Sequence, residues 1–169
     1  MQRHSHSLIV DGTPEEAWSV IHPPPPRVRA DGRRVLEHGD ICIEVLEPGD
    51  AAGQGLVRTV TFRVPKWLLT NGKARSFETI VEARPHEYVR YRAVGRPLWS
   101  LAEGSHRFED LGDGRTRITF EETYQVFNPW LARLLEARVH AFISADNQRL
   151  IRSALDQGIP HLRARRARG

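Results

Sequence analysis

Five polar side chains fall on faces of the predicted elements that are otherwise apolar, where they could do chemistry. They are Arg58, His106, Glu122, Tyr124 and Asp146. Buried polar groups are costly unless they find partners, so we expect these side chains to contact a ligand or one another. In a catalytic site, Glu122 or His106 would act as the general base. Tyr124 or Arg58 would then stabilise the oxygen of an enolate.

The same side chains also have a purely structural interpretation. Arg58 could pair with Glu122, which would satisfy two buried charges and serve nothing else. Because no convincing catalytic set emerges, we expect binding of a ligand rather than catalysis. The predicted ligand-contacting residues are Arg58, Phe62, Trp99, His106, Phe108, Phe120, Glu122, Tyr124, Phe142 and Asp146.

Other residues with reactive side chains do not form a recognisable site. His4 and His6 are spaced like two metal ligands on one strand, but no cluster of carboxylates or cysteines completes a metal site. Cys42 has no histidine and acid partners that would make it a nucleophile. We therefore expect neither a metal ion nor another cofactor.

Alternating apolar and polar residues predict an antiparallel sheet that holds the candidate residues. A period of two places His106 on the face of Phe108, and Glu122 with Tyr124 on the face of Phe120. A single bulge would invert these assignments. Tight turns at Asn-Gly and Gly-Asp-Gly sequences connect successive strands. The predicted strands cover residues 4–10, 40–47, 55–64, 73–83, 87–94, 98–110 and 115–126.

Two helices are expected, one near each end of the chain. Thr13 is a suitable N-cap with Glu16 in the position of a capping box, and this helix ends before the prolines at 23–26. A second helix begins at Pro129 and has apolar residues at helical spacing. Gly158 and Pro160 are expected to stop it, which gives a helix of roughly 40 Å at about 1.5 Å per residue.

This order of elements predicts an α+β protein with a helix-grip fold, in which a curved antiparallel sheet wraps around a long C-terminal helix. One amphipathic helix is available to cover one face of the sheet. Because a twisted sheet and a straight helix do not pack flush, we expect a cavity between them.

Three short motifs carry a resemblance to the START-like, or SRPBCC, superfamily. The segment 8–18 (LIVDGTPEEAW) resembles the superfamily's entry from the first strand into the first helix. The segments 82–91 (EARPHEYVRY) and 112–120 (GDGRTRITF) resemble its proline-containing turn and its glycine-rich hairpin. The match in spacing and order extends from about residue 4 to about residue 158.

The resemblance implies a deep cavity between sheet and helix but no single function, since fold alone does not fix activity. Members include polyketide cyclases and aromatases, lipid-transfer domains, plant ligand carriers and chaperone activators. Residues 23–26 replace part of a second short helix, and residues 75–81 lack the Trp-x-Ser-x-Arg motif of aromatase/cyclases.

Our first hypothesis is a carrier of a small hydrophobic, lipid-like or polyketide-like ligand. The alternatives are a cyclase/dehydratase-type enzyme, or a protein-interaction module with a filled core.

The charge of the chain is concentrated at its C-terminus. The net charge is +4, and four arginines lie between residues 163 and 168, so the remainder is near neutral. We expect one domain over residues 1–160 and a basic tail over 161–169 that is frayed, or that tethers the protein to anionic lipid or RNA. Nucleic acid is not an expected partner of the domain.

A single cysteine, no apolar run of membrane-spanning length and no signal peptide indicate a cytoplasmic protein. The oligomeric state is not indicated.

Overall fold

The described residues of the computed structural model form one sheet and two helices. They are β1 (Gln2–Val10), α1 (Pro14–Ile21), β2 (Arg27–Val28), β3 (Arg34–His38), β4 (Ile41–Glu47), β5 (Val57–Arg63), β6 (Lys73–Arg84), β7 (Tyr88–Gly95), β8 (Trp99–Asp110), β9 (Thr116–Val126) and α2 (Pro129–Arg166). The structure describes residues 2–23, 27–38, 41–64, 66, 71–95, 99–126 and 129–168. It leaves out most side chains between 129 and 147.

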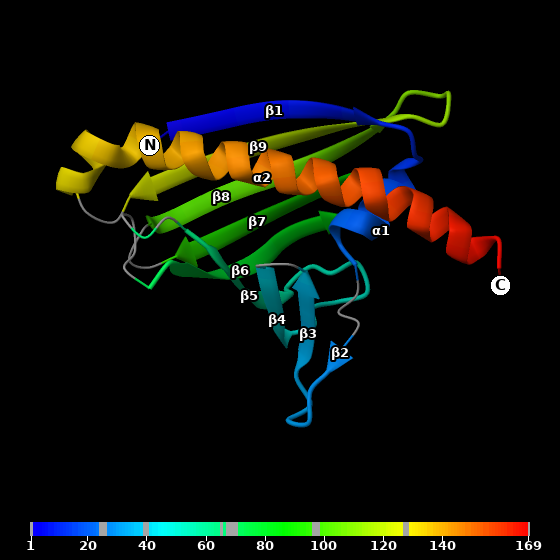
Figure 1. The fold of residues 1–169 in the computed structure, drawn as a ribbon, viewed down its shortest axis with the longest axis horizontal. Helices are drawn as coiled ribbons and strands as arrows, with labels where there is room; N and C mark the ends of the chain where they lie inside the picture. The colour runs from blue at the N-terminus through cyan, green and yellow to red at the C-terminus, as the bar shows by residue number, and fades with distance from the viewer. Residues whose placement is uncertain are drawn as a thin grey trace.

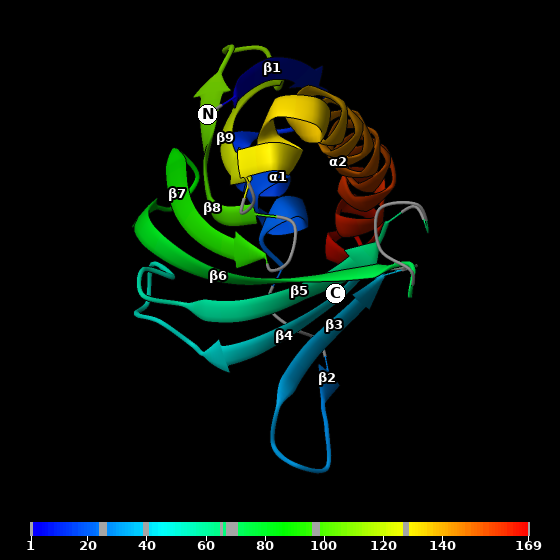
Figure 2. The same ribbon diagram turned by 90° about the vertical axis from the view of Figure 1, so that its left-hand side faces the viewer.

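The strands pair antiparallel in the order β1-β9-β8-β7-β6-β5-β4-β3-β2. Irregularities in the pairing lie in β4, in β6, and at the end where β7 meets β8. Bulges of this kind bend a strand and increase its twist. The sheet accordingly curls around the helices, with α2 running along β1 and β9 (Figures 1 and 2). This confirms the predicted α+β helix-grip fold.

The hairpin of β2 and β3 is an element that we did not predict. It fills the segment between the proline run and β4, and β3 extends the sheet beyond β4. Gly32 in its turn has a φ of 82°, a left-handed conformation that glycine adopts readily. The Asp31-Gly32 pair is a typical hairpin signal and could have identified this turn.

The first helix begins as the sequence predicts. The Thr13 hydroxyl accepts a hydrogen bond from the Glu16 backbone N–H at 3.2 Å, and the Glu16 carboxylate accepts one from the Thr13 N–H at 3.0 Å. These reciprocal bonds form the capping box. They also leave Glu16 buried at the point where α1 meets the end of α2.

The second helix does not end at Gly158 and Pro160, so that prediction was wrong. It continues to Arg166. Gly158 serves the packing of the two helices, because a Cβ there would lie 2.7 Å from a methyl group of Val20 in α1. Neither described helix is long and apolar enough to span a lipid bilayer.

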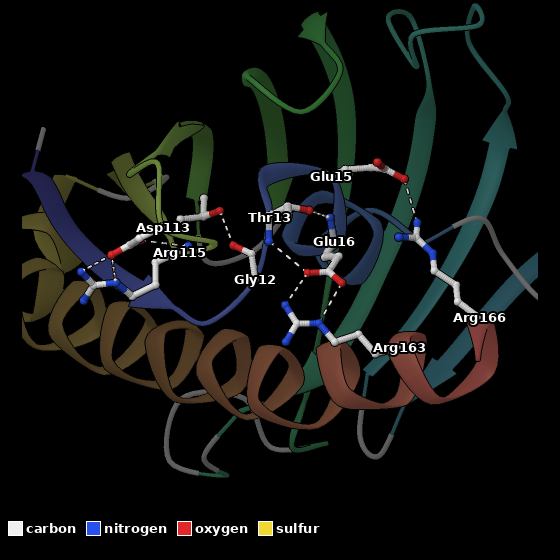
Figure 3. Close-up of polar contacts among 9 residues, drawn as sticks. Gly12, Thr13, Glu15, Glu16, Asp113, Arg115, Arg163 and Arg166 are labelled. Atoms are coloured by element: carbon white, nitrogen blue, oxygen red, sulfur yellow. Dashed lines mark hydrogen bonds and ion pairs between the residues drawn. The ribbon is translucent and has the colours of Figure 1, made fainter. Parts of the chain in front are cut away.

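The last turns of α2 are held against α1 by ion pairs. Arg163 donates two hydrogen bonds to the Glu16 carboxylate, at 2.9 and 2.8 Å, and Arg166 donates one to Glu15 at 2.7 Å (Figure 3). Residues 161–166 are therefore helical and docked, which corrects the expectation of a frayed tail.

The closed core of the protein lies where the two helices cover the sheet. Buried side chains from β1, β8 and β9 pack there against α1 and against Leu155 and Ile159 of α2. Because α2 packs mainly on β1, β9 and α1, it does not extend over the inner face of β4 and β5 (Figure 2). The inner face of the sheet therefore forms part of the core where α2 covers it. On β4 and β5 the same face is not covered by α2.

Candidate functional site

The predicted faces of β8 and β9 are correct. His106 and Phe108 of β8 are buried on the inner face, and so are Phe120, Glu122 and Tyr124 of β9. Strand pairing places His106 opposite Phe120 on neighbouring strands. The inner face thus carries both the aromatic core and several of the predicted polar side chains.

Two tyrosines bind the carboxylate of Glu122. Tyr91 and Tyr124 each donate a hydrogen bond to it, at 3.2 and 3.0 Å. Burial raises the pKa of both tyrosines well above its ordinary value, and the negative charge of Glu122 raises it further. Both phenols stay protonated as donors. Gly104 lies between them on β8, and a Cβ there would overlap the Tyr91 ring.

The suggested pairing of Arg58 with Glu122 does not occur. Arg58 lies directly opposite Glu78 in the pairing of β5 with β6, and its Nε donates to the Glu78 carboxylate at 3.0 Å. The structural interpretation of Arg58 as one half of an internal ion pair is correct, but the partner is different. Arg58 nevertheless remains partly exposed, with 19% of its side chain accessible.

Three uncharged histidine rings form a line across the inner face, with His106 buried and His6 and His22 half-buried. The ring of His106 lies 5.5 Å from that of His22 and 4.8 Å from that of Phe120, and Phe120 stacks on His6 at 4.8 Å. Burial lowers the pKa of all three imidazoles, that of His106 to about 3. Neighbouring positive charge, including Arg58 beside His22 and His106, lowers the pKa of those two further.

Several ring nitrogens of this line have no hydrogen-bond partner among the described residues. They include Nδ1 of His106 and Nε2 of His22. His22 lies directly after α1, where helical periodicity assigns it to neither face, so it was missed in the sequence. An unpartnered buried nitrogen is uncommon in proteins and calls for a functional or structural explanation.

A pocket of about 440 Å³ lies beside His22, on the part of the inner face that α2 leaves free. Its wall on the helix side is Trp18, His22 and Pro23, and the loop between β4 and β5 forms its rim. The remaining lining residues belong to the sheet and its edge: Arg34, Val45, Leu56, Arg58, Ile80, Ala83 and Val89. A pocket of this size, with a mostly apolar floor and a few polar groups, is typical of small-molecule sites.

Among the predicted ligand-contacting residues whose side chains the structure describes, Arg58 alone lines this pocket. Phe108 and Phe120 belong to the closed core, and Phe62 packs beside Tyr124 at the other end of the sheet. The side chains of Trp99, Phe142 and Asp146 lie outside the described residues. A ligand cavity between the sheet and the first half of α2 therefore remains a prediction.

No metal site is visible in the described part of the chain. Among the residues that the structure describes, no three histidine, cysteine, aspartate or glutamate side chains lie in an arrangement that could hold an ion. The rings of His4 and His6 lie 5.4 Å apart, and burial and the neighbouring His4 charge lower the pKa of His6.

The fold is shared by many solved structures that have little sequence in common with this chain. "Ara h 8.0201" superposes with a TM-score of 0.63 at 13% identity, covering 94% of this chain and 98% of its own. TTHA0849 from Thermus thermophilus gives 0.62 at 15% identity, covering 95% and 99%. A START superfamily protein from Mycobacterium smegmatis gives 0.57 at 11% identity, covering 87% and 95%.

The sequence itself matches one protein family over nearly its whole length. No curated protein matches it significantly. The profile described as "Polyketide cyclase / dehydrase and lipid transport" matches residues 1–157, from the first strand into the last turns of α2. The chain therefore belongs to this polyketide cyclase/dehydrase and lipid-transport family.

Proposed function

We propose that the protein binds a small hydrophobic ligand in the pocket beside His22. The observation that carries this proposal is the pocket itself, about 440 Å³ on the inner face of the sheet, with Leu56, Ile80 and Val89 in its floor. Apolar surface that leaves water on ligand binding contributes roughly 25 cal/mol per Å². The family includes lipid transport in its description, which is consistent with such a ligand.

A cyclase-type reaction is the second candidate, because an imidazole faces the pocket and the family includes cyclases. Such a reaction removes a proton from a carbon next to a carbonyl, which requires a base. His22 and His106 are uncharged, but burial lowers the pKa of both well below neutral. A base with so low a pKa is weak, so the site is better suited to binding than to proton abstraction. An interaction module with a filled core is disfavoured by the pocket.

The binding proposal is tested with a neutral fluorescent dye, N-phenyl-1-naphthylamine, whose emission rises in apolar surroundings. We expect the wild-type protein to bind it saturably, and Ala83→Phe, which places a ring in the pocket, to weaken binding by about tenfold or more. Ala141→Phe adds the same ring to an exposed position of α2 and is the matched control.

A folding defect in Ala83→Phe is separated from a blocked pocket by a second variant. Ala52→Phe adds a ring from the rim loop, outside every strand, and is also expected to weaken dye binding. Thermal unfolding followed by circular dichroism verifies that each variant is folded. If folded Ala83→Phe and Ala52→Phe bind the dye as the wild type does, the ligand does not occupy this pocket.

A further inference from the structure

The pocket beside His22 contains one guanidinium group that pairs with no carboxylate among the described residues. Its charged lining residues are Arg34, Arg58 and Asp50. Glu78 neutralises Arg58 through its ion pair at 3.0 Å. One Asp50 oxygen accepts hydrogen bonds from the backbone N–H groups of Ala52 and Gln54, both at 2.9 Å, so this carboxylate is bound to its own loop.

Arg34 makes no hydrogen bond or ion pair with any described residue, unlike the other arginines of its hairpin. Arg27 and Arg29 both bind Glu37, and Arg33 binds Glu44. Among the described residues, three arginines of the hairpin therefore have a carboxylate partner, and the one that lines the pocket has none. A guanidinium is well suited to recognise a carboxylate group.

The register of the sheet places Arg34 and Arg58 on either side of Val45. Arg34 lies opposite Val45, and Val45 lies opposite Arg58. Residues in one cross-strand row point to the same face, and two strand spacings separate the arginines by about 10 Å. All three residues line the pocket, so a ligand group over Val45 would lie between two guanidinium groups.

The opposite wall supplies a polar group that also lacks a partner. Nε2 of His22 is buried and makes no hydrogen bond with the described residues, although Trp18 packs on its ring at 4.6 Å. A ligand in the pocket would contact the His22 ring, whereas this nitrogen itself is shielded from the pocket. The rest of the floor, including Leu56, Ile80 and Val89, offers only apolar contact.

Given the binding function proposed above, we propose that the ligand is an apolar molecule with a single carboxylate, which pairs with Arg34 at the pocket mouth. Arg34, which has no carboxylate partner among the described residues, offers one planar guanidinium for the carboxylate of the ligand. The head would lie near Val45 and His22, and the hydrocarbon part over Ile80 and Val89.

A matched pair of competitors tests this inference: decanoate and decan-1-ol, which have the same chain length and differ in charge. Each displaces N-phenyl-1-naphthylamine from the full-length protein at pH 7.5 and low salt. We expect decanoate to bind about threefold more tightly than the alcohol, because an ion pair with the exposed Arg34 contributes less than about 1 kcal/mol. We also expect added salt to reduce this preference.

Two neighbouring arginines provide the variant and its control. Arg34→Gln should remove the preference for decanoate and leave the affinity for decan-1-ol unchanged. Arg33→Gln, which alters an exposed arginine paired with Glu44, should keep the preference. Equal affinities of both competitors for the wild type, or an unchanged preference in Arg34→Gln, would overturn the carboxylate assignment alone. Failure of the wild type to bind dye and both competitors would overturn the proposed function as well.

Discussion

The two sides of the inner sheet face show how one curved sheet provides both a core and a pocket. Under α2, on β1, β8 and β9, side chains such as Ile118 and Phe120 have no solvent exposure. Beyond α2, on β4 and β5, most side chains are only half-buried. The strands alternate in the same way on both sides, so the presence of the covering helix makes the difference.

Trp18 lies at the boundary between these two sides. Its ring packs against Phe108 of the core at 5.4 Å, and it also lines the pocket. The imidazole of His22 lies beside it, and that of His106 lies beside His22, at the edge of the covered part of the sheet. The polar groups without partners therefore gather where the core ends, which is where a ligand would complete the packing.

The largest effect is expected from one substitution made on each side of the boundary. Leu155→Ala removes a side chain that is 1% exposed, on the face of α2 that packs in the core, and should lower the free energy of unfolding by about 3 kcal/mol. Leu56→Ala removes a half-buried side chain from the pocket floor and should cost about 1 kcal/mol, since the space is already open to solvent. Urea unfolding measures both. Equal losses would show that the two sides are packed alike.

A somewhat smaller loss of unfolding free energy is expected at acidic pH, and it arises from the histidines at the boundary. Since the pKa of His106 is lowered from 6.5 to about 3, the unfolded chain takes up a proton that the folded chain does not. The stabilisation is complete above about pH 6.5 and is lost as the pH falls toward 3. At pH 5, His106 alone should cost about 2 kcal/mol relative to pH 7.

His106→Leu should reduce the difference in unfolding free energy between pH 5 and pH 7 by this amount, with His6 and His22 sustaining the rest. The control is His161→Leu, which alters an exposed imidazole on the last turns of α2 and should leave the difference unchanged. A wild-type and His106→Leu pair with the same pH dependence would contradict the assignment of a buried, uncharged ring.

Much of the fold could be predicted because strand alternation is a rigid geometric rule. A period of two fixes the face of His106 once Phe108 is known to be buried, and it does the same for Glu122 and Tyr124. The hydrogen-bond and ion-pair partners of the candidate residues, such as Arg58, could not be predicted, since they depend on which strands are neighbours in the sheet. Glu78 lies opposite Arg58 on the adjacent strand, whereas Glu122 lies four strands away in the sheet order.

The position of the pocket could not be predicted because it depends on how far α2 extends across the sheet. Its wall residue His22 follows a helix, and Arg34 belongs to a hairpin whose Asp31-Gly32 turn was the one available signal. The role of the other predicted ligand-contacting residues stays a prediction. Gly158 illustrates the same difficulty in a helix, because a glycine that allows close packing has the same sequence signature as one that ends a helix.

The smallest expected effect tests what holds the covered side closed. Glu16→Gln removes the charge that binds Arg163 and should lower the unfolding free energy at pH 7 by about 1–2 kcal/mol. The effect is of this size because Glu16 is buried while Arg163 is half exposed, so solvent screens the pair only in part. The hydrogen bonds of Arg163 lower the pKa of Glu16 from 4.5 to about 2. This stabilisation is therefore present above about pH 4.5 and is lost as the pH falls toward 2.

The difference between wild type and Glu16→Gln in urea unfolding should accordingly shrink as the pH is lowered through this window. Glu15→Gln is the matched control, since Glu15 and Arg166 form the neighbouring ion pair with both side chains more than half exposed, and it should cost less than about 0.5 kcal/mol. Because the Glu16 pair fixes the end of α2 on α1, its loss should not alter dye binding at the pocket. A variant that lost both stability and dye affinity would instead show that the covered side and the pocket form one cooperative unit.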